Sequence, residues 1–373
     1  MDTTQIYTLV NALASQAIGA SDIAVNDLQG LISLGDKIVS SEQNTEAFLN
    51  SLYMQTAKTV ISFRKYDNKF LDMVKSDIEW GGIVQKIKAD MPEAIADPSP
   101  ELVEGQSVDP YKVMKGKVHQ KLFYTRAPYT IGLTTQRRWL KEAFTNPTAM
   151  ATFLNARTGE VQNKLNLTME NLGRTCLCNM IAELAGSARE VKLVTLYNAS
   201  HEAADAVTAG NCFNSPEFLR FSIKKIKDYM KLFTDMSQIF NDGTTTRHTP
   251  FAEQRFRVWS EFESALETSV QWAAFNENYV RLTGYNEYNY LQSIKEGKRT
   301  NINVKRASDG KATTVSNIVA VLYDTDSAGT FREYEDTLTT PVNALGQYYN
   351  TFWHEQQLWF NDLSENCVIF TLN

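Results

Sequence analysis

The sequence has few cysteines, and their spacing excludes two kinds of protein. Cys176, Cys178, Cys212 and Cys367 are the 4 cysteines among 373 residues. Their spacing matches neither a zinc site nor a disulfide framework. Cys176 and Cys178 lie in a predicted helix, where residues two apart point to nearly opposite sides, so they cannot form a disulfide with each other. We expect all four to be small buried residues in a reducing compartment.

The sequence also lacks long apolar runs and an excess of basic residues. Its longest apolar run, Ile318 to Tyr323, is far shorter than a membrane span, and the start of the chain, Met1 to Thr4, has no basic segment typical of a secretory signal. A net charge of −6 and a pI near 5.4 argue against a dedicated nucleic-acid binder. Weak contact with DNA through one basic face stays open. We expect a protein that is made inside a cell.

Residue patterns typical of catalysis are absent. The sequence contains no phosphate-binding loop, dinucleotide-binding glycine motif, nucleophile elbow or paired-histidine zinc motif. His119, His201, His248 and His354 lie in four separate segments without metal-ligand spacing. The acidic pair at positions 324 and 326 is typical of a turn. The sequence therefore predicts no catalytic residue, no cofactor and no metal.

The longest helical pattern runs from Asn146 to Gly186. Asn146 is a favourable N-cap, Pro147 is tolerated at the first helical position, and Gly186 is a favourable C-terminal residue. Between them a stripe recurs in steps of three and four, at Met150, Leu154, Arg157, Val161, Leu165, Thr168, Leu172, Cys176, Asn179 and Glu183. We expect one unbroken helix of about 58 Å with one buried face. Such a rod is typical of shells and large assemblies.

A long hairpin is predicted before this helix. Residues 83–91 alternate between apolar and polar, and residues 117–125 form a second extended segment. Between them, residues 89–111 hold six acidic residues, no Lys or Arg, and four of the nine prolines. The stems carry the basic residues Lys86, Lys88, Lys112, Lys115, Lys117 and Lys121. Because two strands alone are marginally stable, we expect the hairpin to rest on something else, most simply another copy of the chain.

The remaining segments complete an α+β pattern. Helices are expected before residue 70, with one from Asn44 towards Arg64, and from Ser215-Pro216 to about Asn241. The first helices form an arm that either docks on a neighbour or is a frayed lead-in. Lys224, Lys225, Lys227 and Lys231 crowd one helix face, which is either solvated or turned towards DNA or an acidic loop. Strands are expected at 191–197, 255–260, 302–305 and 315–324, a helix at 261–275, and sheet from Tyr348 to Thr371.

Several short stretches resemble one known family. They are Gly35 to Val39, Phe48 to Leu52, Gly81 to Asp90, Leu122 to Arg126 with Tyr129 and Thr134, Leu140 to Phe144, Ala320 to Asp324, and Tyr348 to Trp353. In this order they resemble the major capsid protein of tailed phages with the Hong Kong-type capsid fold. More narrowly, they are similar to capsid proteins of small short-tailed (Picovirinae-like) phages infecting Gram-positive bacteria. Each stretch is short, and together they span most of the chain.

The resemblance implies an α+β phage capsid fold in five segments. These are an N-terminal arm at 1–75, an E-loop β-hairpin at 76–135, a peripheral domain with a long spine helix at 136–197, a central axial α/β domain at 198–325, and a return to the peripheral sheet at 326–373. In such shells the E-loop of one subunit lies over the spine region of its neighbour. Arg137 and Arg138 would then be candidates to receive the acidic tip.

The function implied by the resemblance is structural. It is a non-enzymatic major capsid protein in the virion that self-assembles, as hexamers and pentamers, into an icosahedral or prolate shell around phage double-stranded DNA. Assembly in the host cytoplasm with scaffolding and portal proteins is implied, with weak nonspecific contact between the shell and packaged DNA and no membrane partner. Two alternatives remain: another virion protein (portal, tail or inner protein), or an enzyme with an unrecognised site.

Overall fold

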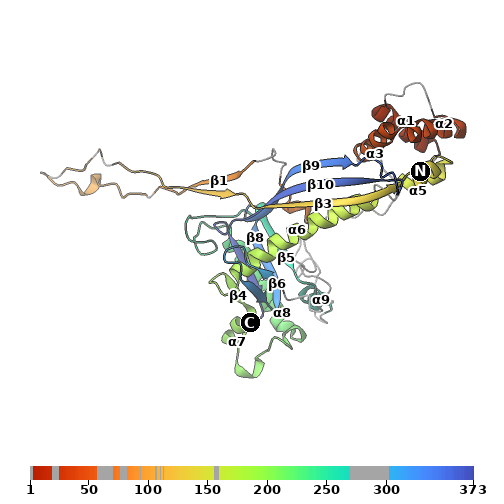
Figure 1. Cartoon of the computed structure of the whole chain (residues 1–373). Coiled ribbons are helices and arrows are strands. Elements are labelled where there is room, and N and C mark those ends of the chain that lie inside the picture. Colours follow the sequence, from red (N-terminus) through yellow and green to blue (C-terminus); the bar gives the residue numbers. More distant parts are fainter. Residues whose placement is uncertain are drawn as a thin grey trace. The chain divides into compact units, whose positions relative to one another are not determined.

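The computed structural model describes residues 3–18, 25–56, 70–75, 82–92, 94–105, 107–109, 111, 113–154, 159–268 and 302–373 (Figure 1). The chain forms two compact units. Unit 1 consists of Met1–Gly82, Arg126–Gly173 and Thr330–Leu358, and unit 2 of Ile83–Thr125, Arg174–Gly329 and Trp359–Asn373. Each unit is therefore assembled from three separate stretches of chain. The α+β class predicted from the sequence is confirmed.

Unit 1 combines helices with a three-stranded sheet. Its elements are α1 (Thr3–Ile18), α2 (Leu28–Ser40), α3 (Glu42–Thr56), β3 (Arg126–Gln136), α4 (Arg137–Ala143), α5 (Pro147–Leu154), and parts of α6 (Glu160–Leu184), β9 (Ala328–Thr339) and β10 (Tyr348–Asn361). α6, β9 and β10 continue into residues of unit 2.

The first helices pack against their own chain. The side chain of Asp27 caps α2 by accepting a hydrogen bond from the Gly30 N–H at 2.7 Å, which satisfies a donor at the helix start. Apolar side chains from α1, α2, α4 and α5, with Phe48 of α3, form one buried cluster. Gly35 allows close approach, since a Cβ there would overlap the side chain of Phe144. The expected helices are confirmed, but α3 begins at Glu42 rather than Asn44, and the segment towards Arg64 lies outside the described residues. One apolar face of these helices is therefore buried in their own chain, and docking of the arm on a neighbour stays a prediction.

The predicted 146–186 helix is described as two helices, α5 and α6, on either side of residues 155–158, which lie outside the described part of the chain. Its ends are as expected: Asn146 Oδ1 accepts a hydrogen bond from the Ala149 N–H at 2.7 Å, and Gly186 has a φ of 76°. Met150 and Leu154 belong to the cluster of the first helices, whereas Val161 and Leu165 pack elsewhere. The predicted stripe is therefore buried at these four positions, but it packs against two different clusters.

The sheet of unit 1 has the strand order β3-β10-β9. β10 pairs antiparallel with β3, from Tyr348 opposite Gln136 to Leu358 opposite Arg126. Val161 and Leu165 of α6 pack on Trp353 of β10 and on the alternating residues Tyr129, Ile131 and Leu133 of β3. Sequence patterning did not predict β3, because Pro128 and Gly132 are poor strand formers. An edge strand tolerates both.

Unit 2 is built around a four-stranded sheet with the order β4-β11-β8-β5. Its elements include β1 (Val84–Ala89), β2 (Val118–Phe123), β4 (Glu190–Lys192), α7 (Leu193–Ser200), α8 (Pro216–Leu232), β5 (Gln254–Val258), α9 (Ser260–Thr268), β6 (Ile302–Lys305), β7 (Ala312–Val315), β8 (Ile318–Asp324) and β11 (Cys367–Thr371). All seven residues of β8 are buried, which explains its continuous apolar sequence. β11 pairs with both β8 and β4, so residues after 326 contribute to both sheets of the chain.

Several element boundaries in unit 2 differ from the prediction. The expected strand at 191–197 is the short β4 followed by helix α7. α8 begins as predicted, with the Ser215 side chain accepting from the Phe218 N–H, but it ends at Leu232 and not near Asn241. The carbonyl of Phe233 accepts the Thr249 N–H at 2.6 Å, so the chain turns into a loop there. The predicted helix at 261–275 is α9 as far as Thr268, and residues 269–301 lie outside the described residues.

The four cysteines are buried and free, as the sequence predicted. Burial raises the pKa of the Cys176 and Cys178 thiols to about 12, so both are neutral at physiological pH. Among the described helices, none is long and apolar enough to cross a membrane.

Leu165 tests the packing of α6 on the sheet. Its side chain is 4% exposed beside Trp353, so Leu165→Asp places an unpaired carboxylate in the core and should prevent soluble folding. Leu167→Asp, at a 37% exposed position of the same helix, is the matched control and should fold. Expression and circular dichroism measure both, and a folded Leu165→Asp protein would contradict the packing. Leu172, predicted to be equally buried, is only half-buried.

Candidate functional site

The residues considered for chemistry do not form a site. His119 lies 3.1 Å from a carboxylate oxygen of Asp90, the ring of His201 stacks on that of Tyr197, and His354 contacts Thr130. His248 is exposed. Asp324 accepts the Asp326 N–H at 2.8 Å, which is the expected turn. Within the described residues, no group of three or more His, Cys, Asp or Glu side chains could hold a metal ion.

An open hollow in unit 1, of about 940 Å³, is apolar in character. Leu133, Trp139, Ala149 and Phe153 contribute to its lining, and Glu142 is its one ionisable lining residue. A single carboxylate beside apolar side chains lacks the paired groups that acid–base or nucleophilic catalysis needs. Among the described residues, the lining of the hollow therefore offers an apolar surface with one carboxylate and no such pair.

Among the described residues, a dense group of charges lies where the hairpin meets the rest of unit 2. β1 pairs antiparallel with β2, which confirms the predicted hairpin. Lys86 lies opposite Lys121, and Lys88 lies opposite His119. Because alternate residues of a strand face the same side, one face of the hairpin presents all three lysines.

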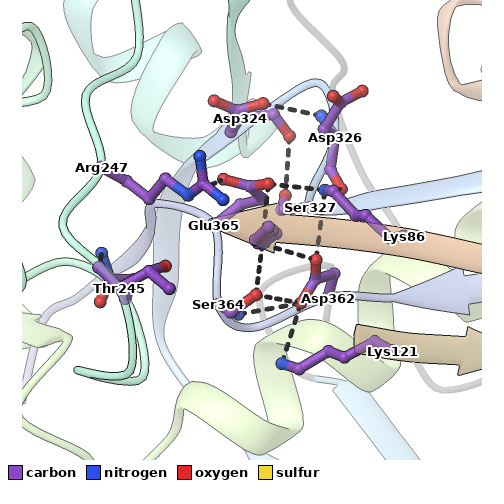
Figure 2. Close-up of polar contacts among 12 residues, drawn as sticks. Lys86, Lys121, Thr245, Arg247, Asp324, Asp326, Ser327, Asp362, Ser364 and Glu365 are labelled. Carbon is purple, nitrogen blue, oxygen red and sulfur yellow. Dashed lines mark hydrogen bonds and ion pairs between the residues drawn. The ribbon is translucent and has the colours of Figure 1, made fainter. Parts of the chain in front are cut away.

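The turn between β10 and β11 supplies the opposite charge (Figure 2). Asp362 is 2.9 Å from Lys88 Nζ, 3.1 Å from Lys86 Nζ and 3.0 Å from Lys121 Nζ. Glu365 is 2.6 Å from Lys86 Nζ and 2.8 Å from Lys88 Nζ. The Asp362 side chain is fully buried and that of Lys88 is 5% exposed. We call Lys86, Lys88, Lys121, Asp362 and Glu365 the ionic anchor.

Neighbouring groups add further polar contacts to the ionic anchor. Ser364 accepts a hydrogen bond from Lys88 and donates one to Asp362 at 2.6 Å. The Asp326 carbonyl accepts from Lys86 at 3.1 Å, and Asp242 pairs with Lys121 at 3.1 Å. Arg247 lies 3.8 Å from Glu365. Buried charges are tolerated when they are paired and hydrogen-bonded in this way.

Apolar and backbone contacts join the same regions. The rings of Phe123 and Phe360 lie 5.1 Å apart, and the Trp359 N–H donates to the Thr125 carbonyl at 3.0 Å. The hairpin is therefore attached to unit 2 by its charged face and by its end.

The ionisation of the anchor follows from these contacts. Burial alone would raise the pKa of Asp362, but hydrogen bonds from Lys88 and Ser364 and the charges of Lys86 and Lys88 hold that pKa well below its ordinary value. Burial alone would lower the pKa of Lys86, but Glu365 and Asp362 raise it. The pKa of Lys121 is raised in the same way, by Asp362 and Asp242. Asp362, Lys86 and Lys121 are therefore charged around neutral pH, and the arrangement suits fixing the hairpin rather than proton transfer.

Sequence reasoning recognised the basic stems but not their partners. The alternation in β1 places Lys86 and Lys88 on one face, which the sequence alone indicates. The acidic residues of the turn at 362–365 lie more than 230 residues away in the chain, and no periodicity connects them to the hairpin. Arg137 and Arg138, the residues expected to receive the acidic tip, have partners within unit 1. Arg137 donates to the Val39 carbonyl, and Arg138 pairs with Glu142 at 2.8 Å.

Comparison with known proteins decides the family. The chain matches the Phi29-like phage major capsid protein family over residues 10–371. The chain belongs to this family. The capsid protein is thus a shell-forming structural component of a bacteriophage virion, as its sequence predicted, and family membership implies that its copies associate with one another.

Solved phage structures share the fold of the capsid protein. A chain of the Staphylococcus phage Andhra capsid has 8% identity and a TM-score of 0.53, with 84% of this chain and 87% of that chain covered. A chain from native bacteriophage P68, in a structure of its head fiber and inner core protein, has 10% identity and a TM-score of 0.52 over 84% and 87%. A capsid chain of Cyanophage P-SCSP1u has 10% identity and a TM-score of 0.50 over 84% and 91%. No curated protein matches the sequence.

Asp362 tests the ionic anchor. Asp362→Asn removes the carboxylate shared by three lysines, and breaking a buried ion pair from one side typically costs about 3–5 kcal/mol. We expect lower resistance to denaturant and faster hydrogen exchange in β1 and β2. Lys115→Met, at an exposed position of the hairpin outside the ionic anchor, is the control and should change stability by less than about 0.5 kcal/mol. Unchanged exchange in Asp362→Asn would show that the anchor does not hold the hairpin.

The pH dependence of the anchor has a definite sign. Ionised Asp362 contributes to the free energy of unfolding. This stabilisation is fully present above the ordinary pKa of about 3.9 and is lost as the pH falls through the lower pKa of Asp362 in the folded state. The stabilisation contributed by protonated Lys86 and Lys121 is fully present below about pH 10.4. It is lost as the pH rises through the raised pKa values of these two lysines in the folded state. Hydrogen exchange of β1 and β2, corrected for intrinsic rates, should show constant protection from about pH 5 to pH 9. A loss of protection in β1 and β2 between pH 5 and pH 9 would contradict the assignment of these charges to the ionic anchor.

Proposed function

We propose that this capsid protein forms a closed icosahedral or prolate shell around phage double-stranded DNA. Family membership over residues 10–371 is the observation that carries the proposal. Hexamers and pentamers of the chain would be its capsomers, assembled in the host cytoplasm with scaffolding and portal proteins. The five segments expected from the resemblance, from the arm at 1–75 to the return at 326–373, belong to the same proposal.

The hairpin is the element proposed to join one subunit to the next. Its tip is exposed in the described residues between 94 and 111, and four prolines and six acidic residues at 89–111 leave it little to bury by itself. The ionic anchor holds the other end of the hairpin to its own subunit. A projection that is fixed at its base and uncovered at its tip suits contact with another copy. In the terms of the resemblance, it would be the E-loop.

Contact with packaged DNA is proposed to be weak and nonspecific. Lys224, Lys225 and Lys227 of α8 are its expected contributors, although Lys225 also lies over the ring of Phe221, 5.7 Å from its centroid. A net charge of −6 favours holding DNA by confinement rather than by tight contacts. A duplex-binding titration should show affinity that falls steeply with salt. Nanomolar, sequence-selective binding at physiological salt would contradict this.

Electron microscopy of the purified chain, with and without co-expressed scaffold, tests the shell. We expect closed shells or hexameric sheets. A single dodecameric ring would support a portal instead, and discrete small particles would support an enzyme.

Limited proteolysis tests the hairpin within the shell. Residues 89–111 should be cut in free subunits, where the tip is uncovered, and protected in assembled particles. Mass spectrometry of the fragments locates the cuts. Cleavage within Ala307–Gly310, an exposed turn between β6 and β7, serves as the reference in both states. Equal protection of 89–111 in both states would count against an inter-subunit hairpin.

A further inference from the structure

Two buried glutamates in the sheet of unit 1 differ in the partners around them. Glu333 of β9 is 7% exposed and Glu355 of β10 is 2% exposed. The Arg126 Nε–H donates to both carboxylate oxygens of Glu333, at 3.0 and 2.8 Å, and Gln356 donates to one of them at 2.8 Å. Glu333 therefore has the paired and hydrogen-bonded surroundings that a buried charge needs.

Glu355 lies on the face of the sheet that α6 covers. Alternate residues of a strand share one face, so Glu355 is on the same side as Trp353, on which Val161 and Leu165 of α6 pack. Its partner across the sheet is Tyr129, whose hydroxyl donates a hydrogen bond to Glu355 Oε2. Among the described residues, no donor reaches the other oxygen, Oε1. One carboxylate oxygen is thus buried without a hydrogen bond.

The charges near Glu355 compensate an ionised carboxylate poorly. Arg332 Nη2 lies 3.9 Å from Glu355 Oε1, which is too far for a hydrogen bond. The same arginine donates from Nη1 to Glu335 at 3.2 Å, and Glu335 carries a like charge that disfavours ionised Glu355. On α6 in unit 1, the ionisable side chains that the structure describes are the exposed Lys164 and the buried Glu170.

Gln357 offers an acceptor that a proton on Glu355 would satisfy. Gln357 Nε2 donates to the Tyr129 hydroxyl at 3.1 Å, while the Gln357 side-chain oxygen is buried and accepts no hydrogen bond from the described part of the chain. Gln357 is two residues beyond Glu355 on the same strand face. A protonated carboxyl has one donor as well as acceptors, so protonated Glu355 could donate to Gln357 while still accepting from Tyr129.

The local environment favours the neutral forms of both groups. Burial is the largest cause that raises the pKa of Glu355 above its ordinary value, against opposing effects of Tyr129 and Arg332. Burial also raises the pKa of Tyr129, and the neighbouring Glu355 raises it further, so this tyrosine keeps its proton and remains a donor.

We propose that Glu355 makes the packing of α6 on the sheet of unit 1 sensitive to protons. Protonated Glu355 completes a neutral hydrogen-bonded group with Tyr129 and Gln357 under the helix. Loss of the proton leaves a negative charge there, and this charge favours opening of α6 from the sheet. The stabilisation is fully present below the ordinary glutamate pKa of about 4.3 and is lost as the pH rises through the raised pKa of folded Glu355.

Hydrogen exchange of the full-length free subunit tests this contact. Protection of residues 161–173 of α6, corrected for intrinsic rates, should fall at least tenfold as the pH rises from 5 to 9, because each unit of raised pKa changes the opening equilibrium about tenfold. Protection of β1 and β2 over the same range is the internal reference and should stay constant. Constant or rising protection of α6 would overturn the proposal.

Glu355→Gln separates a protonated carboxyl from an ionised one. The amide is neutral and can both donate and accept, so α6 should keep its protection from pH 5 to pH 9 and exceed the unmodified subunit at least tenfold at pH 9. Glu333→Gln is the matched control. It removes a carboxylate that has its partners, so protection should fall at every pH in this range while the decline of α6 with pH remains.

The opposite result for Glu355→Gln has a clear meaning. If this variant fails to fold, or loses protection of α6 at pH 9, then Glu355 acts as an ionised partner of Arg332 and Tyr129, and the proposal is overturned. Neither result bears on the shell function, which electron microscopy of the unmodified chain tests separately.

Discussion

The interaction on which the hairpin depends is the pairing of three lysines with two carboxylates at its base. Two strands alone are marginally stable, and among the described residues the sheet of β1 and β2 has no third strand. Lys88 and Asp362 are nearly removed from water and lie 2.9 Å apart, so removing one side chain leaves the other buried without this partner. The anchor therefore gives the hairpin one orientation, and this orientation determines that its apolar face and acidic tip stay uncovered.

The rest of the fold is consistent with a building block. The core of unit 2 packs α7, α8 and α9 against a sheet whose central strand β8 is buried on both faces. In unit 1, α6 packs on β3 and β10, and the first helices pack on α4 and α5. These cores are apolar and explain stability, whereas the ionic anchor serves attachment of the hairpin. Family membership agrees with this division, because a shell subunit requires oriented surfaces rather than a reactive centre.

Local chemistry accounts for the elements that were predicted correctly. Asn146 and Ser215 cap helices because a side-chain oxygen meets an N–H two or three residues later, and this geometry needs no tertiary context. The period of two in residues 84–89 gave β1, and the continuous apolar run gave β8. Where propensity was weak, as in β3 with its proline and glycine, the sheet partner β10 determined the strand. The helix α7 replaced a predicted strand because short apolar runs suit either structure.

By itself, the sequence determined the α+β class, the hairpin, the buried cysteines and, through resemblance, the capsid family. It also placed Lys86 and Lys88 on one strand face, because side-chain direction in a strand depends only on residue parity. Only the tertiary structure decided which way that face points. The partner carboxylates, Asp362 and Glu365, come from a turn far along the chain, and contacts between distant residues depend on how whole elements pack. For the same reason, the sequence showed alternation in the hairpin, but only the fold showed that its apolar side is the one left exposed.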